Sequence, residues 1–87
     1  MPQVELLGLA RRYAGTGYAS CAGATLGEVL LNLGQQFPAF AGHCPTGKLL
    51  PPGLVVCINE RTFSDDPSRA ISEVDRLLIL SADVGGA

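Results

Sequence analysis

The segment TLGEVLLNLGQQF, residues 25–37, is the strongest structural signal in this sequence. Thr25 can accept a hydrogen bond at the start of a helix, and Glu28 can bond back to the cap, which is a capping box. The apolar side chains that follow recur at helical spacing along one stripe, namely Leu26, Val29, Leu30, Leu33 and Phe37,. Pro38 cannot continue the helix. The segment is therefore predicted to be an amphipathic helix that covers one face of a sheet.

Five short apolar segments around this helix are predicted to be strands. The two before the helix are separated by a glycine-containing turn, which is typical of a hairpin. The first segment after the helix is rich in β-branched residues, as expected of a central strand that is buried on both faces. The next is a short edge strand. In chain order the predicted strands are 4–10, 18–22, 54–59, 61–63 and 76–81.

The order strand, strand, helix, strand, short strand, strand predicts an α+β protein with a β-grasp, ubiquitin-like fold. We expect a mixed sheet of four to five strands with one main helix on one face. Residues 38–53 contain four prolines and three glycines, so a long loop that could contain one helical turn is predicted there,. Residues 1–81 would form the domain. Residues 82–87 would form a flexible tail that extends about 20 Å, long enough to enter a partner's active site.

The composition is that of one folded domain. The chain has 87 residues, of which 47% are hydrophobic and 16% charged, so it has enough apolar surface for a single core,. No apolar stretch approaches the roughly 20 residues that span a bilayer, and no secretory leader is recognisable, so a cytoplasmic location without membrane contact is expected. The net charge of −2 with scattered basic residues argues against nucleic-acid binding,.

Two features suggest chemistry at first sight but are interpreted as structural. Cys21, Cys44 and Cys57 lack the Cys-x-x-Cys spacing of zinc sites, so free thiols are predicted and no metal is expected,. The segment 42–48 has the glycine and lysine spacing of a phosphate-binding loop. Leu49 stands where that motif needs Ser or Thr, and the helix precedes the segment instead of following it,. We interpret it as an ordinary loop.

Several elements, taken together in their order and spacing, resemble the MoaD/ThiS family of ubiquitin-like sulfur carriers. The elements that carry this resemblance are Leu9-Ala10-Arg11-Arg12-Tyr13-Ala14-Gly15, Thr25-Leu26-Gly27-Glu28-Val29-Leu30, Gly47-Lys48-Leu49, Val56-Cys57-Ile58-Asn59, Val74-Asp75-Arg76-Leu77-Leu78-Ile79-Leu80 and Val84-Gly85-Gly86. The length and the long loop after the helix are closer to the MoaD branch, including the carriers used in cysteine biosynthesis, than to the shorter ThiS branch.

The resemblance implies a carrier that is not itself an enzyme and binds no cofactor. In the family, a ThiF/MoeB-like enzyme uses ATP to adenylate the carboxylate of the second glycine, which corresponds to Gly86. Sulfur then displaces AMP, and the resulting thiocarboxylate donates sulfur to a synthase, as the molybdopterin synthase small subunit does in molybdenum cofactor biosynthesis. Val84, Gly85 and Gly86 would be the recognised part of the tail. Ala87 departs from the family pattern, and we expect a zinc-dependent peptidase to remove it.

The resemblance also implies that partners bind the sheet face that the helix leaves uncovered. Candidate residues for this surface are Leu7, Leu9, Val56, Leu78 and Leu80, although alternation alone does not say which of them face the helix. Two other functions remain open. The chain could be a protein modifier that is attached through Gly86 to lysines, or a β-grasp binding module with an inert tail. The sulfur acceptor would be specified by the partner and not by this sequence.

Overall fold

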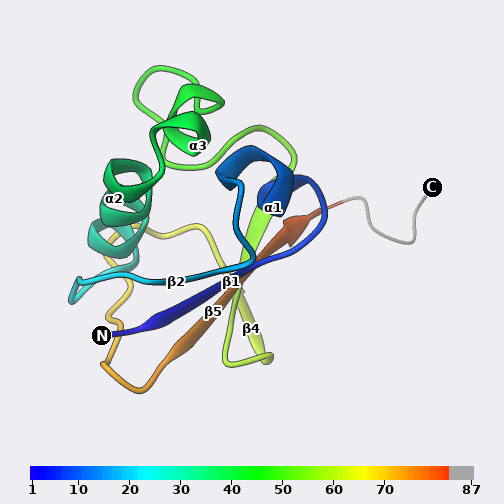
Figure 1. The fold of residues 1–87 in the computed structure, drawn as a ribbon. Coiled ribbons are helices and arrows are strands. Elements are labelled where there is room, and N and C mark those ends of the chain that lie inside the picture. The colour runs from blue at the N-terminus through cyan, green and yellow to red at the C-terminus, as the bar shows by residue number, and fades with distance from the viewer. Residues whose placement is uncertain (83–87) are drawn as a thin grey trace.

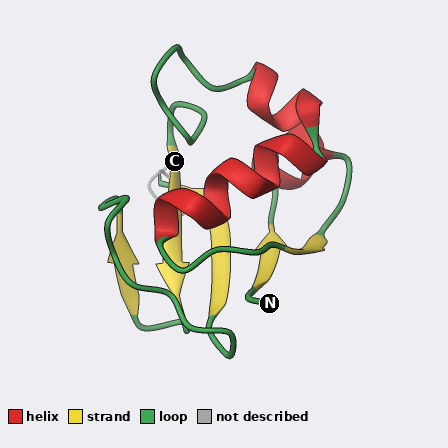
Figure 2. Ribbon diagram, turned by 90° about the vertical axis from the view of Figure 1, so that its left-hand side faces the viewer, coloured by secondary structure: helices red, strands yellow, loops and turns green. Residues whose placement is uncertain are grey.

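The computed structural model describes residues 1–82. They form a mixed five-stranded sheet, and the helix α2 (Leu26–Gln36) packs across one face of it (Figure 1; Figure 2). The strands lie in the order β2-β1-β5-β3-β4. β1 and β5 are parallel, and the other neighbours are antiparallel. The elements are β1 (Gln3–Leu6), α1 (Leu9–Ala14), β2 (Tyr18–Ser20), α2 (Leu26–Gln36), α3 (Pro38–Gly42), β3 (Leu54–Ile58), β4 (Thr62–Ser64) and β5 (Arg76–Ser81). The predicted β-grasp fold is confirmed.

Helix α2 begins with the predicted capping box. The Glu28 backbone N–H donates to Thr25 Oγ1 at 3.2 Å, and the Glu28 carboxylate accepts from the Ala24 N–H at 2.8 Å. The apolar stripe of the helix faces the sheet, because Leu26, Val29, Leu30 and Leu33 are all buried in one core. Phe37 caps the helix end and packs against this core while remaining half-buried.

The first predicted strand is too long, and this is a correction. β1 ends at Leu6, and Gly8 turns the chain with a φ of +53°, a conformation that favours glycine,. Residues 9–14 then form α1, in which Ala10 is fully buried. A short apolar run fits a strand and a buried helix turn about equally well, so its periodicity could not separate the two.

Pro38 stands at the first position of a further short helix, α3, as well as ending α2. Proline is suited to this position because its missing N–H would have no partner in the first turn of a helix. Phe40 on α3 is fully buried and is among the largest side chains in the core. The predicted long loop therefore contains one helical segment, and its irregular part begins after Gly42.

A hydrogen-bonded cluster joins the β3–β4 turn to the start of β5. The Asn59 side chain donates to Asp75 Oδ1 at 2.9 Å and accepts from the Arg76 N–H at 2.9 Å. The Ser72 N–H donates to Asp75 Oδ2 at 2.8 Å. These hydrogen bonds lower the pKa of the Asp75 carboxyl, and the bond from the Ser72 N–H has the larger effect, followed by the bond from the Asn59 side chain. Asn59 itself has a φ of +54°, which asparagine tolerates better than most residues,.

We expect Asp75→Asn to reduce the loss of stability in acid. The pKa of Asp75 is lower in the folded protein than in the unfolded chain, where it is about 3.9,. The carboxylate therefore stabilises the fold at pH values above the unfolded pKa, and this stabilisation is lost as the pH falls through the folded pKa. The free energy of unfolding, measured in urea at about pH 6 and about pH 3, should therefore fall less in Asp75→Asn than in the parent. Glu73→Gln, which removes an exposed neighbouring acid, is the control. Equal pH dependence in the parent and Asp75→Asn would contradict this assignment.

Candidate functional site

Alternation along the three inner strands separates a core face from an open face of the sheet. The side chains under α2 are Val4 and Leu6 on β1, Leu77 and Ile79 on β5, and Leu54, Val56 and Ile58 on β3. Val56 is fully buried among them, so its prediction as a partner-binding residue is wrong. Leu9 lies on α1 and packs against the same core, so it does not belong to the open face either. For both residues, alternation alone does not tell whether the side chain enters the core, because this depends on the neighbouring strand and helix.

The open face carries a row of side chains that crosses all five strands. Glu5 pairs with Tyr18 and with Leu78, and Cys57 pairs with Leu78 and with Phe63. The half of the row on β2 and β1 is polar, since Tyr18 Oη donates to the Glu5 carboxylate at 3.3 Å. The half on β5, β3 and β4 is apolar.

The apolar half extends along the strands and forms one surface, here called the open-face patch. Leu80 pairs with Val55 in the next row, so the patch consists of Val55, Cys57, Phe63, Leu78 and Leu80. Phe63 is 64% exposed, whereas Leu78 and Leu80 are half-buried. A contiguous apolar surface of this kind is typical of a protein-binding site. Phe63 was missed in the sequence, because its place beside Cys57 depends on strand pairing.

The described chain ends beside this patch. The Ala82 N–H donates to the Gly53 carbonyl oxygen at 2.7 Å, which fixes the last described residue at the start of β3. Leu7 is 38% exposed, and its N–H donates to the Ile79 carbonyl oxygen at 3.0 Å, so it lies at the same end of the sheet. Figure 1 shows that β5 ends near α1 at this end of the sheet. Leu7, Leu78 and Leu80 are therefore brought together with the exit of the chain.

The predicted tail residues lie beyond the described part of the chain. Val84, Gly85, Gly86 and Ala87 fall within 83–87, outside the described residues. Their roles stay predictions from the sequence. The structure places the base of the tail, at Ala82, and the surface next to it.

The three cysteines are free thiols, as predicted. Cys21 and Cys44 have raised pKa values because of burial, and for Cys21 the value rises to about 11. Cys57 is buried, but on the open face between Leu78 and Phe63 and not under α2. Within residues 1–82, no three His, Cys, Asp or Glu side chains are grouped as metal ligands. No helix in the same residues is long and apolar enough to cross a membrane.

Comparisons with known proteins identify similar folds but no similar sequence. No protein-family model matches the chain, and no curated protein matches it either. The small archaeal modifier protein 1 from Methanosarcina acetivorans is similar with a TM-score of 0.78 and 23% identity, over 98% of this chain and 95% of that chain. CysO from Mycobacterium tuberculosis, described as an antigen, is similar with a TM-score of 0.74 and 21% identity, over 94% and 99%.

A third similar structure is the BexX/CysO complex from Amycolatopsis orientalis, with a TM-score of 0.76 and 20% identity, over 94% of this chain and 96% of that chain. At these identities the likeness establishes the shared β-grasp fold.

Two substitutions in adjoining strands test which face of the sheet is the core face and which is the open face. Val56→Ala removes buried methyl groups, and we expect it to lower the free energy of unfolding by about 2 kcal/mol. Leu80→Ala, on the open face, should lower it by less than about 1 kcal/mol. Urea unfolding of the two variants and the parent measures the difference. A larger loss for Leu80→Ala than for Val56→Ala would reverse the assignment of the two faces.

Proposed function

We propose that this chain is a sulfur carrier whose Gly86 carboxylate is activated and converted to a thiocarboxylate. The observation that carries the proposal is the continuity between β5 and the diglycine. Leu78 and Leu80 on this strand contribute to the open-face patch, and Ala82 and Asp83 are all that separate the strand from Val84-Gly85-Gly86. A partner that binds the patch therefore has the reacting end of the chain within reach.

The chemistry follows from the weak electrophilicity of a carboxylate. A ThiF/MoeB-like enzyme transfers AMP from ATP to the Gly86 carboxylate, with release of pyrophosphate, and sulfide then displaces AMP to give the thiocarboxylate. When a persulfide is the sulfur donor instead, it displaces AMP to form an acyl disulfide, and a second thiol of the donor enzyme reduces the S–S bond, which leaves the thiocarboxylate on Gly86 and a disulfide on the donor. The thiocarboxylate passes its sulfur to a synthase and is regenerated. Adenylation and sulfur transfer are carried out by groups on these partners, so the carrier supplies the recognition surface and the acyl end but no cofactor.

Ala87 must be removed before this cycle can begin. With Ala87 present, the Gly86 carbonyl is an amide, and the free carboxylate is displaced by about 3.5 Å. Misplacement by 1 Å can already cost a factor of about 100 in rate. We propose that a zinc-dependent peptidase trims the chain to Gly86.

The acceptor that we propose is an enzyme of cysteine biosynthesis. The sequence resemblance includes carriers of that pathway, and CysO is among the proteins of similar fold. The alternative suggested by the MoaD branch is molybdenum cofactor biosynthesis, in which the chain would act as a small subunit of the synthase.

A second candidate function is supported by the likeness to the small archaeal modifier protein 1. A protein modifier uses the same activation of its last glycine, but the acyl group ends on an amine of a target protein instead of on sulfur. Stable covalent conjugates, resolved on a denaturing gel of a cell lysate, distinguish a modifier from a carrier.

Activation can be tested with ATP–pyrophosphate exchange in the presence of a ThiF/MoeB-like enzyme from the source cells. We expect the chain ending at Gly86 to support exchange at least about 100-fold faster than the chain ending at Ala87, because the reacting carboxylate is then correctly placed. Similar rates for the two chains would contradict the proposed trimming. The absence of exchange with either chain would contradict activation itself.

The docking surface can be tested in the same assay. Leu80→Asp places a charge in the open-face patch, and we expect it to weaken the apparent affinity for the enzyme by about 10-fold or more. The matched control is Leu31→Asp, because Leu31 is 53% exposed on α2, on the other side of the sheet. A comparable loss in both variants would show that the open-face patch is not the docking surface.

A further inference from the structure

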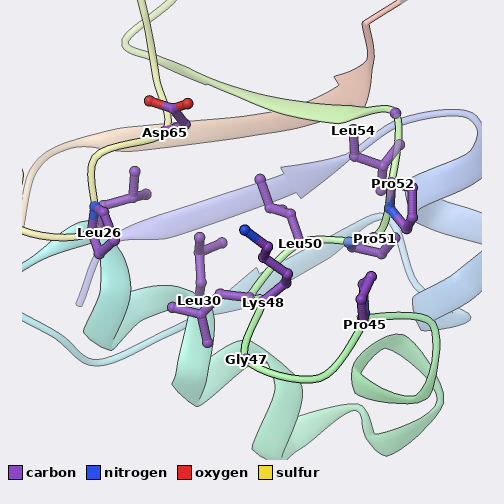
Figure 3. A pocket seen from close by; sticks show the side chains of 13 residues that line it. Leu26, Leu30, Pro45, Gly47, Lys48, Leu50, Pro51, Pro52, Leu54 and Asp65 are labelled. Atoms are coloured by element: carbon purple, nitrogen blue, oxygen red, sulfur yellow. The ribbon is translucent and has the colours of Figure 1, made fainter.

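A cleft of about 660 Å³ lies on the α2 side of the sheet, away from the open-face patch (Figure 3). The start of α2 forms one wall with Leu26 and Leu30, and residues 45–54 form the other. Most of its lining is apolar, with Lys48 extending into it and Asp65 at its edge. Its volume is in the range of ligand-binding clefts.

The last strand of the sheet ends at the rim of this cleft. Gly53 lines the cleft, and its carbonyl oxygen accepts a hydrogen bond from the Ala82 N–H at 2.7 Å. Ser81, the last residue of β5, is paired with Leu54, which also lines the cleft. The residues that follow Ala82 therefore start beside the cleft.

The chain beyond Ala82 is long enough to cross the cleft. A sphere with the volume of the cleft is about 11 Å across, and four extended residues, 83–86, reach about 14 Å,. Their composition also suits a largely apolar cleft. Val84 brings one apolar side chain, and Gly85 and Gly86 bring none that could block the approach of the backbone,.

A β-turn places a cation beside the cleft. In residues 45–48 the Lys48 N–H donates to the Pro45 carbonyl oxygen at 2.9 Å. Gly47 has a φ of +79°, which a type II turn requires at its third position,. This turn belongs to the segment whose glycine and lysine spacing imitates a phosphate-binding loop. The spacing thus serves to position the Lys48 ammonium group at the cleft.

Lys48 is the one cationic residue among those that line the cleft. Within residues 1–82, its ammonium group takes part in no hydrogen bond or ion pair; the only ion pair there joins Arg76 and Glu60. In Figure 3, Lys48 lies between the end of the cleft at Leu54 and the end at Asp65. A carboxylate that enters beside Leu54 therefore meets the ammonium group before it meets the acid.

We propose that the cleft binds the C-terminal end of its own chain, with the Gly86 carboxylate paired with the Lys48 ammonium group. In this arrangement Val84 packs against the apolar walls, and Asp83 stays at the rim beside Ala82. The binding itself needs no sulfur, whereas its role rests on the proposed function. After sulfur loading, the thiocarboxylate takes the place of the carboxylate at Lys48. The cleft then shields this nucleophile from electrophiles in solution until a partner takes it.

A weak site is sufficient because the ligand is tethered to it. An exposed lysine–carboxylate pair contributes little on its own, and one valine side chain adds a modest apolar contact. A short linker gives the chain end an effective concentration on the order of 1 mM, so a site with a dissociation constant of about 1 mM is half occupied. Weak binding also allows the active site of a partner to withdraw the end from the cleft.

Occupation of the cleft leaves the open-face patch accessible, because the two surfaces lie on opposite sides of the sheet. A partner can therefore dock on the patch while the acyl end is still in the cleft. Docking and release of the end are then separate steps, and the end is exposed to solvent only between them.

The shielding can be tested on chains of residues 1–86 whose Gly86 thiocarboxylate is made by cleaving an intein thioester with sulfide, so no adenylating enzyme is needed. Alkylation by iodoacetamide is followed by intact mass. We expect Lys48→Gln and Val84→Ser to react about 2-fold faster than the parent, because the free fraction of the end rises from about one half towards one. Val84→Ser changes no residue within 1–82, so it leaves the described fold as it is.

Two control variants separate this pairing from a general effect of charge. Lys48→Arg keeps the cation and should react at close to the parent rate. Arg61→Gln removes an exposed cation from the β3–β4 turn, at the far end of β3 from Gly53, and should leave the rate unchanged. Equal rates for the parent and Lys48→Gln, or an equal acceleration by Arg61→Gln, would overturn the proposal.

The contact can be tested without sulfur, on the chain that ends with the Gly86 carboxylate. We expect nuclear Overhauser effects between the methyl groups of Val84 and those of Leu30 or Leu54. A mixture of labelled and unlabelled chains distinguishes contacts within one chain from contacts between two copies. No such effect, or effects only between copies, would overturn the proposal and leave the carrier function standing. Failure of ATP–pyrophosphate exchange, in turn, would remove the proposed function without changing this result.

Discussion

Strand β5 is the element on which the rest of this structure depends. It is hydrogen-bonded to β1 on one side and to β3 on the other, and its side chains alternate between the two faces of the sheet. Leu77 and Ile79 enter the core under α2, while Leu78 and Leu80 face outward. Because the side-chain period of a strand is two, a shift of register by one residue would exchange these pairs. The same strand therefore fixes the core, the open-face patch and the point from which the C-terminal residues start.

The sequence predicts best those elements whose signals are local. The capping box at Thr25 and the bounds of β5 could be read directly, because a cap and a charged start at Arg76 are marked by neighbouring residues. The segment after Leu6 was misassigned, since six helical residues are too short to show a period,. Val56 was a wrong candidate for the partner-binding surface, because the side of the sheet that it faces depends on which neighbour covers the strand.

The candidate site shows the same division between local and long-range information. Leu78 and Leu80 could be named from the resemblance, and they do lie on the open face. Phe63 could not be named, because its place in the open-face patch depends on the pairing of β4 with β3. The open-face patch would receive the activating partner.

The central claim is that Gly86 carries sulfur, and the most direct test is the intact mass of the protein from its native cells, purified without reducing or alkylating agents. The account predicts a species that ends at Gly86 and in which one oxygen is replaced by sulfur, with its fraction rising under sulfur demand. If every molecule kept Ala87 and an unmodified carboxylate under that demand, the claim would be contradicted. The chain would then act as a β-grasp binding module.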